Sequence, residues 1–229
     1  MKMPNLLSEL SESVRWRLMV DAAKKGMAAQ GYSLARVPGR GLSNIWTVSK
    51  DGKSKMASIR TTRDRHIAFP PLEGGAKWKT LDDVDLVVVA TVDSKEDPEN
   101  VEVYLFPADD VRKRFNAHYV ARSKDGQTIK DNFGMWVGLE HDDRGIAASV
   151  GTGIIDHYKP IAVYAIADLL ADNPHIETGG EEPVEGTGEM AAAPSLSTIA
   201  DVMAWARDRV AHLAGVQTDA VKLDLKIEY

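Results

Sequence analysis

Cysteine is absent from the 229 residues, and the chain has no long apolar run. The lack of cysteine excludes a disulfide scaffold, a zinc-thiolate site, an iron-sulfur cluster and a cysteine nucleophile. The longest apolar run, residues 86–92 with one threonine in it, is far shorter than the roughly 20 residues of a membrane-spanning helix. The start of the sequence also lacks the apolar region of an export signal, so we expect a cytoplasmic protein without a membrane partner.

Motifs of metal and nucleophile chemistry are scarce as well. The six histidines show none of the HxxxH, HxH or HExxH spacings, and no GxSxG occurs. Gly151-Thr152-Gly153 lacks the lysine that follows the glycines of a phosphate loop. We therefore expect no histidine metal site, no hydrolase nucleophile elbow, and a simple turn at residues 151–153.

What is present is the composition of an ordinary globular protein, with 44% hydrophobic and 27% charged residues. The net charge of -6 is unevenly distributed. Residues 1–135 hold 22 Lys and Arg against 18 Asp and Glu, whereas residues 136–229 hold 6 against 16. The basic balance of the N-terminal part favours contact with a polyanion. The alternative is that the acidic surface only keeps the protein in solution. Both interpretations stay open.

Composition divides the chain into three parts. Residues 173–194 are rich in Gly, Pro and Glu without apolar periodicity, which is typical of a flexible acidic linker between a body at 1–172 and a C-terminal unit at 195–229. In that unit, apolar spacing predicts a helix up to Gly215 and then a half-buried strand near the end of the chain. Because a helix and a lone strand cannot bury themselves, we expect the strand to join a sheet in the body or in a second copy of the chain.

Within the body, the pattern predicts a helix at residues 11–30 and another that begins near Asp109. Asp51-Gly52 predicts a tight hairpin turn, residues 84–92 a strand buried on both faces, and residues 101–106 an edge strand. Extended segments are expected at 32–37, 45–49, 55–60, 66–69, 84–92 and 101–106. This order predicts an α/β (α+β) fold with a central mixed β-sheet flanked by helices and a C-terminal helix-strand extension. Trp46, Phe69 and Trp136 are expected in the core, and base stacking is the alternative role of Trp136.

Residues 44–115 also carry an ordered series of motifs. A hairpin strand contains Ser58-Ile59-Arg60 and is followed by Thr and Arg, the next long strand begins with Val84-Asp85, and a further strand ends at Pro107 before a helix. Over roughly residues 12–115, this series resembles the core of the PD-(D/E)XK nucleases, the restriction-endonuclease-like superfamily. The resemblance implies a restriction-endonuclease-like core.

In that superfamily, an Asp on one strand and an acidic residue two positions before a Lys on the next hold Mg²⁺ and assist the attacking water. On this sequence the three positions fall at or near Asn44, Ser58 and Arg60. Asn and Ser do not supply anionic oxygens, and Arg stays protonated. The resemblance therefore implies a degenerate motif with no metal and no other cofactor. If the alignment is shifted, the spare carboxylates are Asp51, Asp64, Asp85 and Glu12; we interpret Asp51 as a turn former and Asp64 as the partner of a neighbouring Arg.

The densest cationic group of the chain is then the candidate nucleic-acid-binding site, since Arg presents two parallel donors to a phosphate. Arg63 and Arg65 share one side if their strand continues through them. The alternative is a solvated surface paired to Asp64, Asp82 and Asp83. A second basic stretch between Arg112 and Lys130 is explained equally well by a helix dipole. The candidate group is Arg60, Arg63, Arg65, Lys77 and Lys79.

Three functions follow. The first is a DNA- or RNA-backbone-binding protein on a catalytically degenerate nuclease-like fold, which is not an enzyme. The second is a protein-interaction or regulatory homodimer, formed through residues 195–229 and without a nucleic acid ligand. The third is a divergent Mg²⁺-dependent endonuclease, the one case in which Mg²⁺ is a cofactor. We place the first slightly ahead of the second, and both ahead of the third.

Overall fold

The structure is a computed structural model of the chain, and it describes residues 10–37 and 45–173 together with Leu7, Met203, Arg207 and Lys222. The chain divides into two compact units, Met1–Pro183 and Val184–Tyr229, and the elements described below belong to the first. The predicted linker at 173–194 and C-terminal unit at 195–229 lie almost wholly outside the described residues. Of the predicted C-terminal helix, the two described residues, Met203 and Arg207, are helical.

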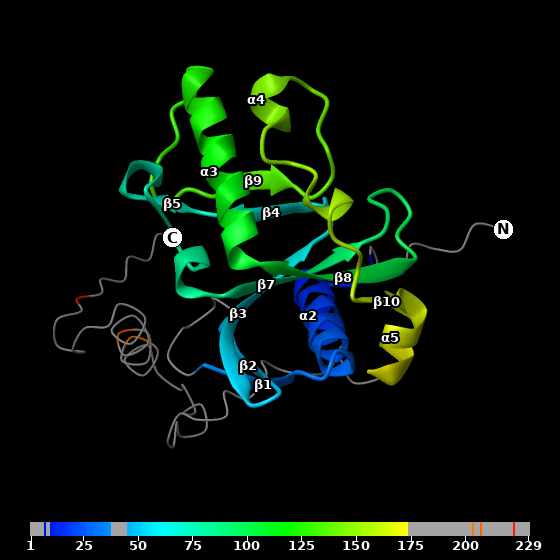
Figure 1. The fold of residues 1–229 in the computed structure, drawn as a ribbon. Helices are drawn as coiled ribbons and strands as arrows, with labels where there is room; N and C mark the ends of the chain where they lie inside the picture. The colour runs from blue at the N-terminus through cyan, green and yellow to red at the C-terminus, as the bar shows by residue number, and fades with distance from the viewer. Residues whose placement is uncertain are drawn as a thin grey trace. The chain divides into compact units, whose positions relative to one another are not determined.

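A mixed sheet forms the centre of the first unit (Figure 1). In the described part of the chain it has six strands in the order β1-β2-β3-β7-β8-β10. Neighbouring strands are antiparallel except β3 and β7, which are parallel. The strands are β1 Ser33–Arg36, β2 Ile45–Lys50, β3 Lys53–Thr62, β7 Leu86–Val92, β8 Asn100–Pro107 and β10 Ala162–Ala165. The predicted α/β fold with a central mixed sheet is thus confirmed.

Helices and a small second sheet cover the two faces of this sheet (Figure 1). Helices α2 (Glu12–Ala29) and α5 (Ile166–Asp172) enclose one core cluster, which includes Val88 of β7. On the opposite face, α3 (Ala108–Lys124) and the two-stranded sheet of β4 (His66–Phe69) and β9 (Met135–Gly138) enclose a second cluster. That cluster takes Val87 and Val89, so β7 is buried on both faces as predicted. The remaining elements are the β5–β6 hairpin (Pro71–Leu72 and Lys77–Trp78), α4 (Ile146–Ser149) and the 3-10 turns at Glu73–Gly75, Leu81–Asp83 and Ile154–Asp156.

Local sequence signals set the ends of these elements. Ser11 caps α2 by accepting a 3.3 Å hydrogen bond from the Val14 backbone N–H, and Gly31 follows the helix with a φ of +84°. The turn between β2 and β3 is Asp51-Gly52, with positive φ at both residues, as the hairpin signal predicts. None of the described helices is long and apolar enough to cross a membrane.

Two predictions about exposure are wrong. Residues 101–106 do not form an edge strand, because β10 pairs with the far side of β8 and places Ala162 opposite Val103. Trp136 is not a core residue, since Met135 and Val137 take the inward positions of β9 and leave the indole 48% exposed. Trp46 and Phe69 are buried as expected.

Candidate functional site

Two of the three nuclease-motif positions share one face of β3. Ser58 lies opposite Val87 and Arg60 opposite Val89, both residues of the second core cluster, while Ile59 belongs to the first cluster. Ser58 is fully buried, and within the described residues neither its Oγ nor the buried Nε of Arg60 has a hydrogen-bond partner. Ser58 is also paired across the hairpin with Ile45, the first residue of β2. The third position, Asn44, lies outside the described residues.

Arg60 is a desolvated cation. Its guanidinium carbon lies 4.5 Å from the centroid of the Phe69 ring. Burial lowers the pKa of Arg60 to about 10, so the group is still protonated at neutral pH, and no carboxylate in the described part of the chain offsets the burial. The Phe69 ring supplies a cation–π contact but no negative charge. Because an unpaired buried cation is costly, this environment favours an anion.

Arg65 serves a different purpose from Arg60. Strand β3 ends at Thr62, and Arg65 sits in the turn to β4 with a φ of +59°, so the strand does not continue through Arg63 and Arg65 as the shared-side prediction required. The Arg65 side chain is buried, with Nη1 3.1 Å from Glu102 and Nε 2.8 Å from Glu140 but without hydrogen-bond geometry to the latter. Nη1 also donates to the Val92 carbonyl. Arg63, in contrast, is exposed with no partner among the described residues.

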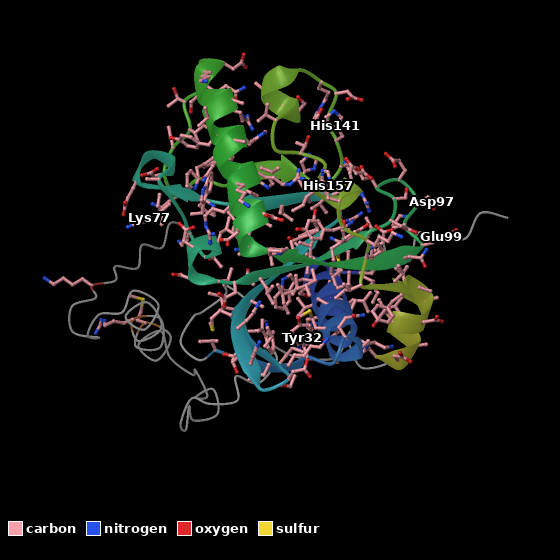
Figure 2. The ribbon with its side chains drawn as sticks, viewed as in Figure 1. Tyr32, Lys77, Asp97, Glu99, His141 and His157 are labelled. Carbon is pink, nitrogen blue, oxygen red and sulfur yellow. The ribbon has the colours of Figure 1, made fainter. Side chains whose placement is uncertain are left out.

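Lys77 and Lys79 lie on and just after the β5–β6 hairpin, on either side of Trp78, which is a buried anchor that donates from Nε1 to Asn116 over 2.7 Å. Lys77 projects outward and pairs with Glu73 at 2.8 Å (Figure 2). Lys79 is exposed and has no partner in the part of the chain that the structure describes. The five predicted cations are therefore not equivalent. Arg60 is a desolvated cation, Arg63 and Lys79 are exposed, and Arg65 and Lys77 are held in ion pairs.

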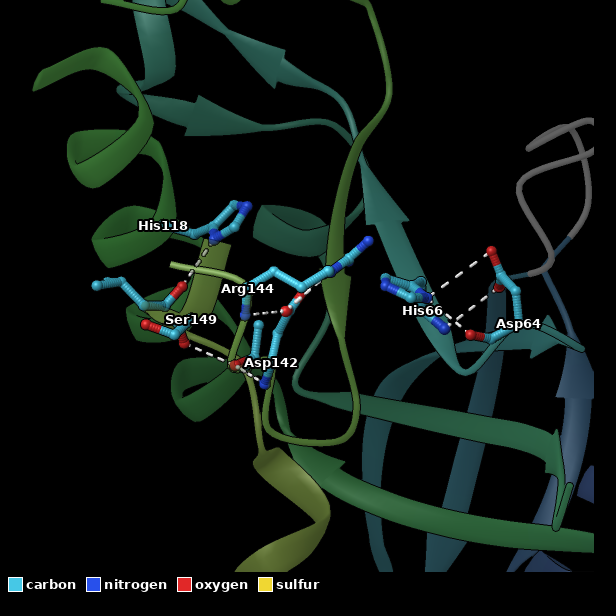
Figure 3. A network of polar contacts seen from close by, with 8 residues as sticks. Asp64, His66, His118, Asp142, Arg144 and Ser149 are labelled. Atoms are coloured by element: carbon cyan, nitrogen blue, oxygen red, sulfur yellow. Dashed lines mark hydrogen bonds and ion pairs between the residues drawn. The ribbon is translucent and has the colours of Figure 1, made fainter. Parts of the chain in front are cut away.

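Two of the three expected acidic partners, Asp64 and Asp82, contact other groups. Asp64 accepts a 2.7 Å hydrogen bond from Thr62 and also contacts His66, so its interpretation as the partner of a neighbouring Arg is wrong (Figure 3). Asp82 binds the Trp78 backbone N–H at 2.7 Å and Arg112 at 2.6 Å.

The second basic stretch also has structural contacts. Lys113 pairs with Asp110 at 3.2 Å, and Arg114 donates to the Thr152 carbonyl at 2.8 Å. His118, one turn further along α3, contacts the Val150 carbonyl through Nδ1 at 2.7 Å (Figure 3). These contacts fix the predicted turn at 151–153 against α3. Only Lys124 and Lys130 of this stretch are exposed cations without a partner among the described residues.

The described residues contain no group of three or more His, Asp or Glu able to hold a metal ion. The chain matches no family model, no curated protein and no solved structure. The residues and the geometry of the described unit are therefore the basis for a proposed function.

The exposure of one aromatic pair was not predicted from the sequence. Phe133 and Trp136 are 65% and 48% exposed, and their rings meet edge to face with centroids 6.1 Å apart. The signal was the spacing of two aromatic residues around Gly134, which the prediction of a core tryptophan left unused.

Proposed function

We propose that the chain binds the sugar-phosphate backbone of DNA or RNA at the Arg60 end of β3, on a nuclease-like core that lacks the cation-binding acids. The observation that carries this proposal is the protonated, largely buried Arg60 guanidinium with no anionic partner in the described part of the chain. A phosphate oxygen provides the missing charge, and a guanidinium presents parallel donors to it. The exposed Arg63, three residues further along, adds a second cation at this end of the strand.

The order of elements supports the nuclease-like core. The hairpin brings β2 beside β3, β7 follows Val84-Asp85, and β8 ends at Pro107 immediately before α3. This is the succession of hairpin, buried strand, further strand and helix on which the resemblance rests.

The donor chemistry at the site favours binding over metal-dependent cleavage. A serine hydroxyl at position 58 and a guanidinium at position 60 offer no anionic oxygen to Mg²⁺. Two of the spare carboxylates have structural uses, since Asp51 forms the hairpin turn and Asp85 Oδ2 accepts a 2.8 Å hydrogen bond from the Met56 backbone N–H. Asp64 is bound to Thr62.

The test is the anisotropy of a fluorescein-labelled DNA or RNA oligomer titrated with the full chain between about 50 and about 200 mM salt. We expect binding that weakens with salt, and Arg60→Gln to reduce the slope of log K against log salt by about 0.7 to 0.9, the value of one phosphate contact. Lys113→Gln is the matched control, because Lys113 is an exposed cation already paired with Asp110. The absence of wild-type binding at low salt, or equal effects of the two variants, would overturn the proposal.

A further inference from the structure

The exposed aromatic pair Phe133–Trp136 is not required by the core. Ile67, Phe69, Met135 and Val137 fill the inward positions of the β4–β9 sheet, and Trp136 lies on its outer side opposite Ala68. An exposed indole and an exposed phenyl ring have no packing role that would explain them.

The backbone is shaped to hold the indole in place. A Cβ atom at Gly134 would lie 2.9 Å from Trp136 Cη2 and 3.1 Å from Cζ2, so the ring rests directly against the glycine backbone. The edge of the Phe133 ring meets it at an interplanar angle of 76°. Trp136 is thus held between a glycine and a second ring, while almost half of its surface remains open to solvent.

Two exposed lysines lie on backbone segments near this pair. The Lys79 backbone N–H donates to the Pro70 carbonyl and the Asn132 backbone N–H donates to the Pro71 carbonyl, both at 2.9 Å. Lys79 and the loop that carries Phe133 therefore both lie beside the Pro70-Pro71 segment. Lys130 begins the turn that ends at Phe133, and both lysines are exposed without a partner among the described residues. Of the acidic neighbours, Glu73 is paired with Lys77, whereas Asp131 accepts a hydrogen bond from the neutral Gly74 backbone N–H.

Arg60 lies on the opposite side of the β4–β9 sheet from this pair. Its guanidinium carbon lies over Phe69, a fully buried inward residue of β4, whereas Trp136 lies on the outer side opposite Ala68. The two accessible aromatic rings instead lie near segments that carry two exposed lysines, Lys79 and Lys130. That combination of rings and cations suits a polyanion whose bases are free to stack, because the bases of a duplex are stacked on one another and present only their edges.

We propose that the Phe133–Trp136 pair is a base-stacking platform and that the preferred ligand is single-stranded nucleic acid. This inference rests on the proposed backbone-binding function. On this side of the β4–β9 sheet, Lys79 and Lys130 contact phosphates, and Trp136 stacks on a base.

The test compares three labelled probes of equal length by anisotropy: a dT 20-mer, an abasic phosphodiester 20-mer and a 20-base-pair duplex. Trp136→Ala should weaken dT binding by about 5-fold to about 150-fold, the range for one stacked base, and leave the abasic probe unaffected. Trp136→Phe should restore part of the loss. Gly134→Ala, which displaces the indole while both aromatic residues remain, should act in the same direction as Trp136→Ala.

Trp16→Ala is the matched control, because Trp16 is a 42% exposed indole on α2, which packs on the other face of the central sheet. Equal dT affinities of the Trp136→Ala and Trp16→Ala proteins, or wild-type binding to dT no tighter than to the abasic probe, would overturn the stacking platform. If Arg60→Gln still weakens both probes in that case, backbone binding stands without it. No binding of any probe would refute both proposals.

Discussion

Arg65 and Glu102 form an ion pair inside the first unit, with Arg65 Nη1 3.1 Å from Glu102 Oε2 and exposed fractions of 7% and 21% for the two side chains. Tyr104 donates a 3.0 Å hydrogen bond to the same carboxylate oxygen. The pair connects the turn after β3 to β8. It explains why Arg65, a member of the densest cationic group in the sequence, is not available to a ligand.

Removal of one partner should be strongly destabilising, because it leaves the other charge buried and unpaired. We expect Arg65→Met to lower the free energy of unfolding by about 3 kcal/mol, near the low end for buried pairs since Glu102 is partly exposed. The double variant Arg65→Met, Glu102→Leu should recover part of that loss. Urea titration followed by circular dichroism measures the free energy of unfolding of both variants. A double variant no more stable than Arg65→Met alone would contradict this account.

Replacement of Arg60 should have the opposite sign. Arg60→Met removes a desolvated cation that has no anionic partner in the described part of the chain and keeps an unbranched side chain against Phe69. We expect an increase in stability of about 1 kcal/mol. Arg63→Met, at an exposed position, should change stability by less than about 0.5 kcal/mol. Thermal melts of the two variants and the wild type at low ionic strength measure these changes in stability. A loss of stability in Arg60→Met would argue that Arg60 has a structural rather than a ligand-binding role.

His118 should make the protein less stable in acid. Burial lowers the pKa of His118, and the nearby Arg122 acts in the same direction. The unfolded chain takes up a proton near pH 6.5 while the folded state remains neutral, so stability is full above that pH and declines as the pH falls toward the folded pKa.

The decline should reach at most about 1.4 kcal/mol per pH unit. Urea midpoints at pH 7.5 and pH 5.5 should therefore differ less in His118→Asn than in the wild type. His157→Asn, at an exposed histidine, is the control and should keep the wild-type difference (Figure 2). A His118→Asn protein with an unchanged pH dependence would remove His118 as the cause.

Two glycines separate the effect of backbone conformation from that of close packing. Gly151 and Gly126 have φ values of +85° and +81°, but a Cβ at Gly151 would lie 2.4 Å from the Arg114 carbonyl oxygen, whereas a Cβ at Gly126 meets nothing within 4 Å. Gly126→Ala should cost about 1 kcal/mol from the left-handed backbone alone. Gly151→Ala should cost about 1 to 3 kcal/mol more, because the turn must separate from α3. Similar melting temperatures for the two variants would mean that the turn moves freely.

The sequence by itself determined the elements whose signals are local. Periodicity and a serine cap define α2, Asp51-Gly52 defines the hairpin, and a continuous apolar run defines β7. The placement of Ser58 and Arg60 on one strand face also followed, because side chains alternate along any strand.

Only the tertiary structure decided which of the cations and rings are available to a ligand. Glu102 and Glu140, which pair with Arg65, come from β8 and from the segment after β9. Strand β10, which pairs with the edge of β8, is about 60 residues further along the chain than β8. Trp136 is exposed because its neighbours Met135 and Val137 occupy the inward positions of β9. Residue type and spacing carry no information about such distant partners, since burial depends on which segments pack together.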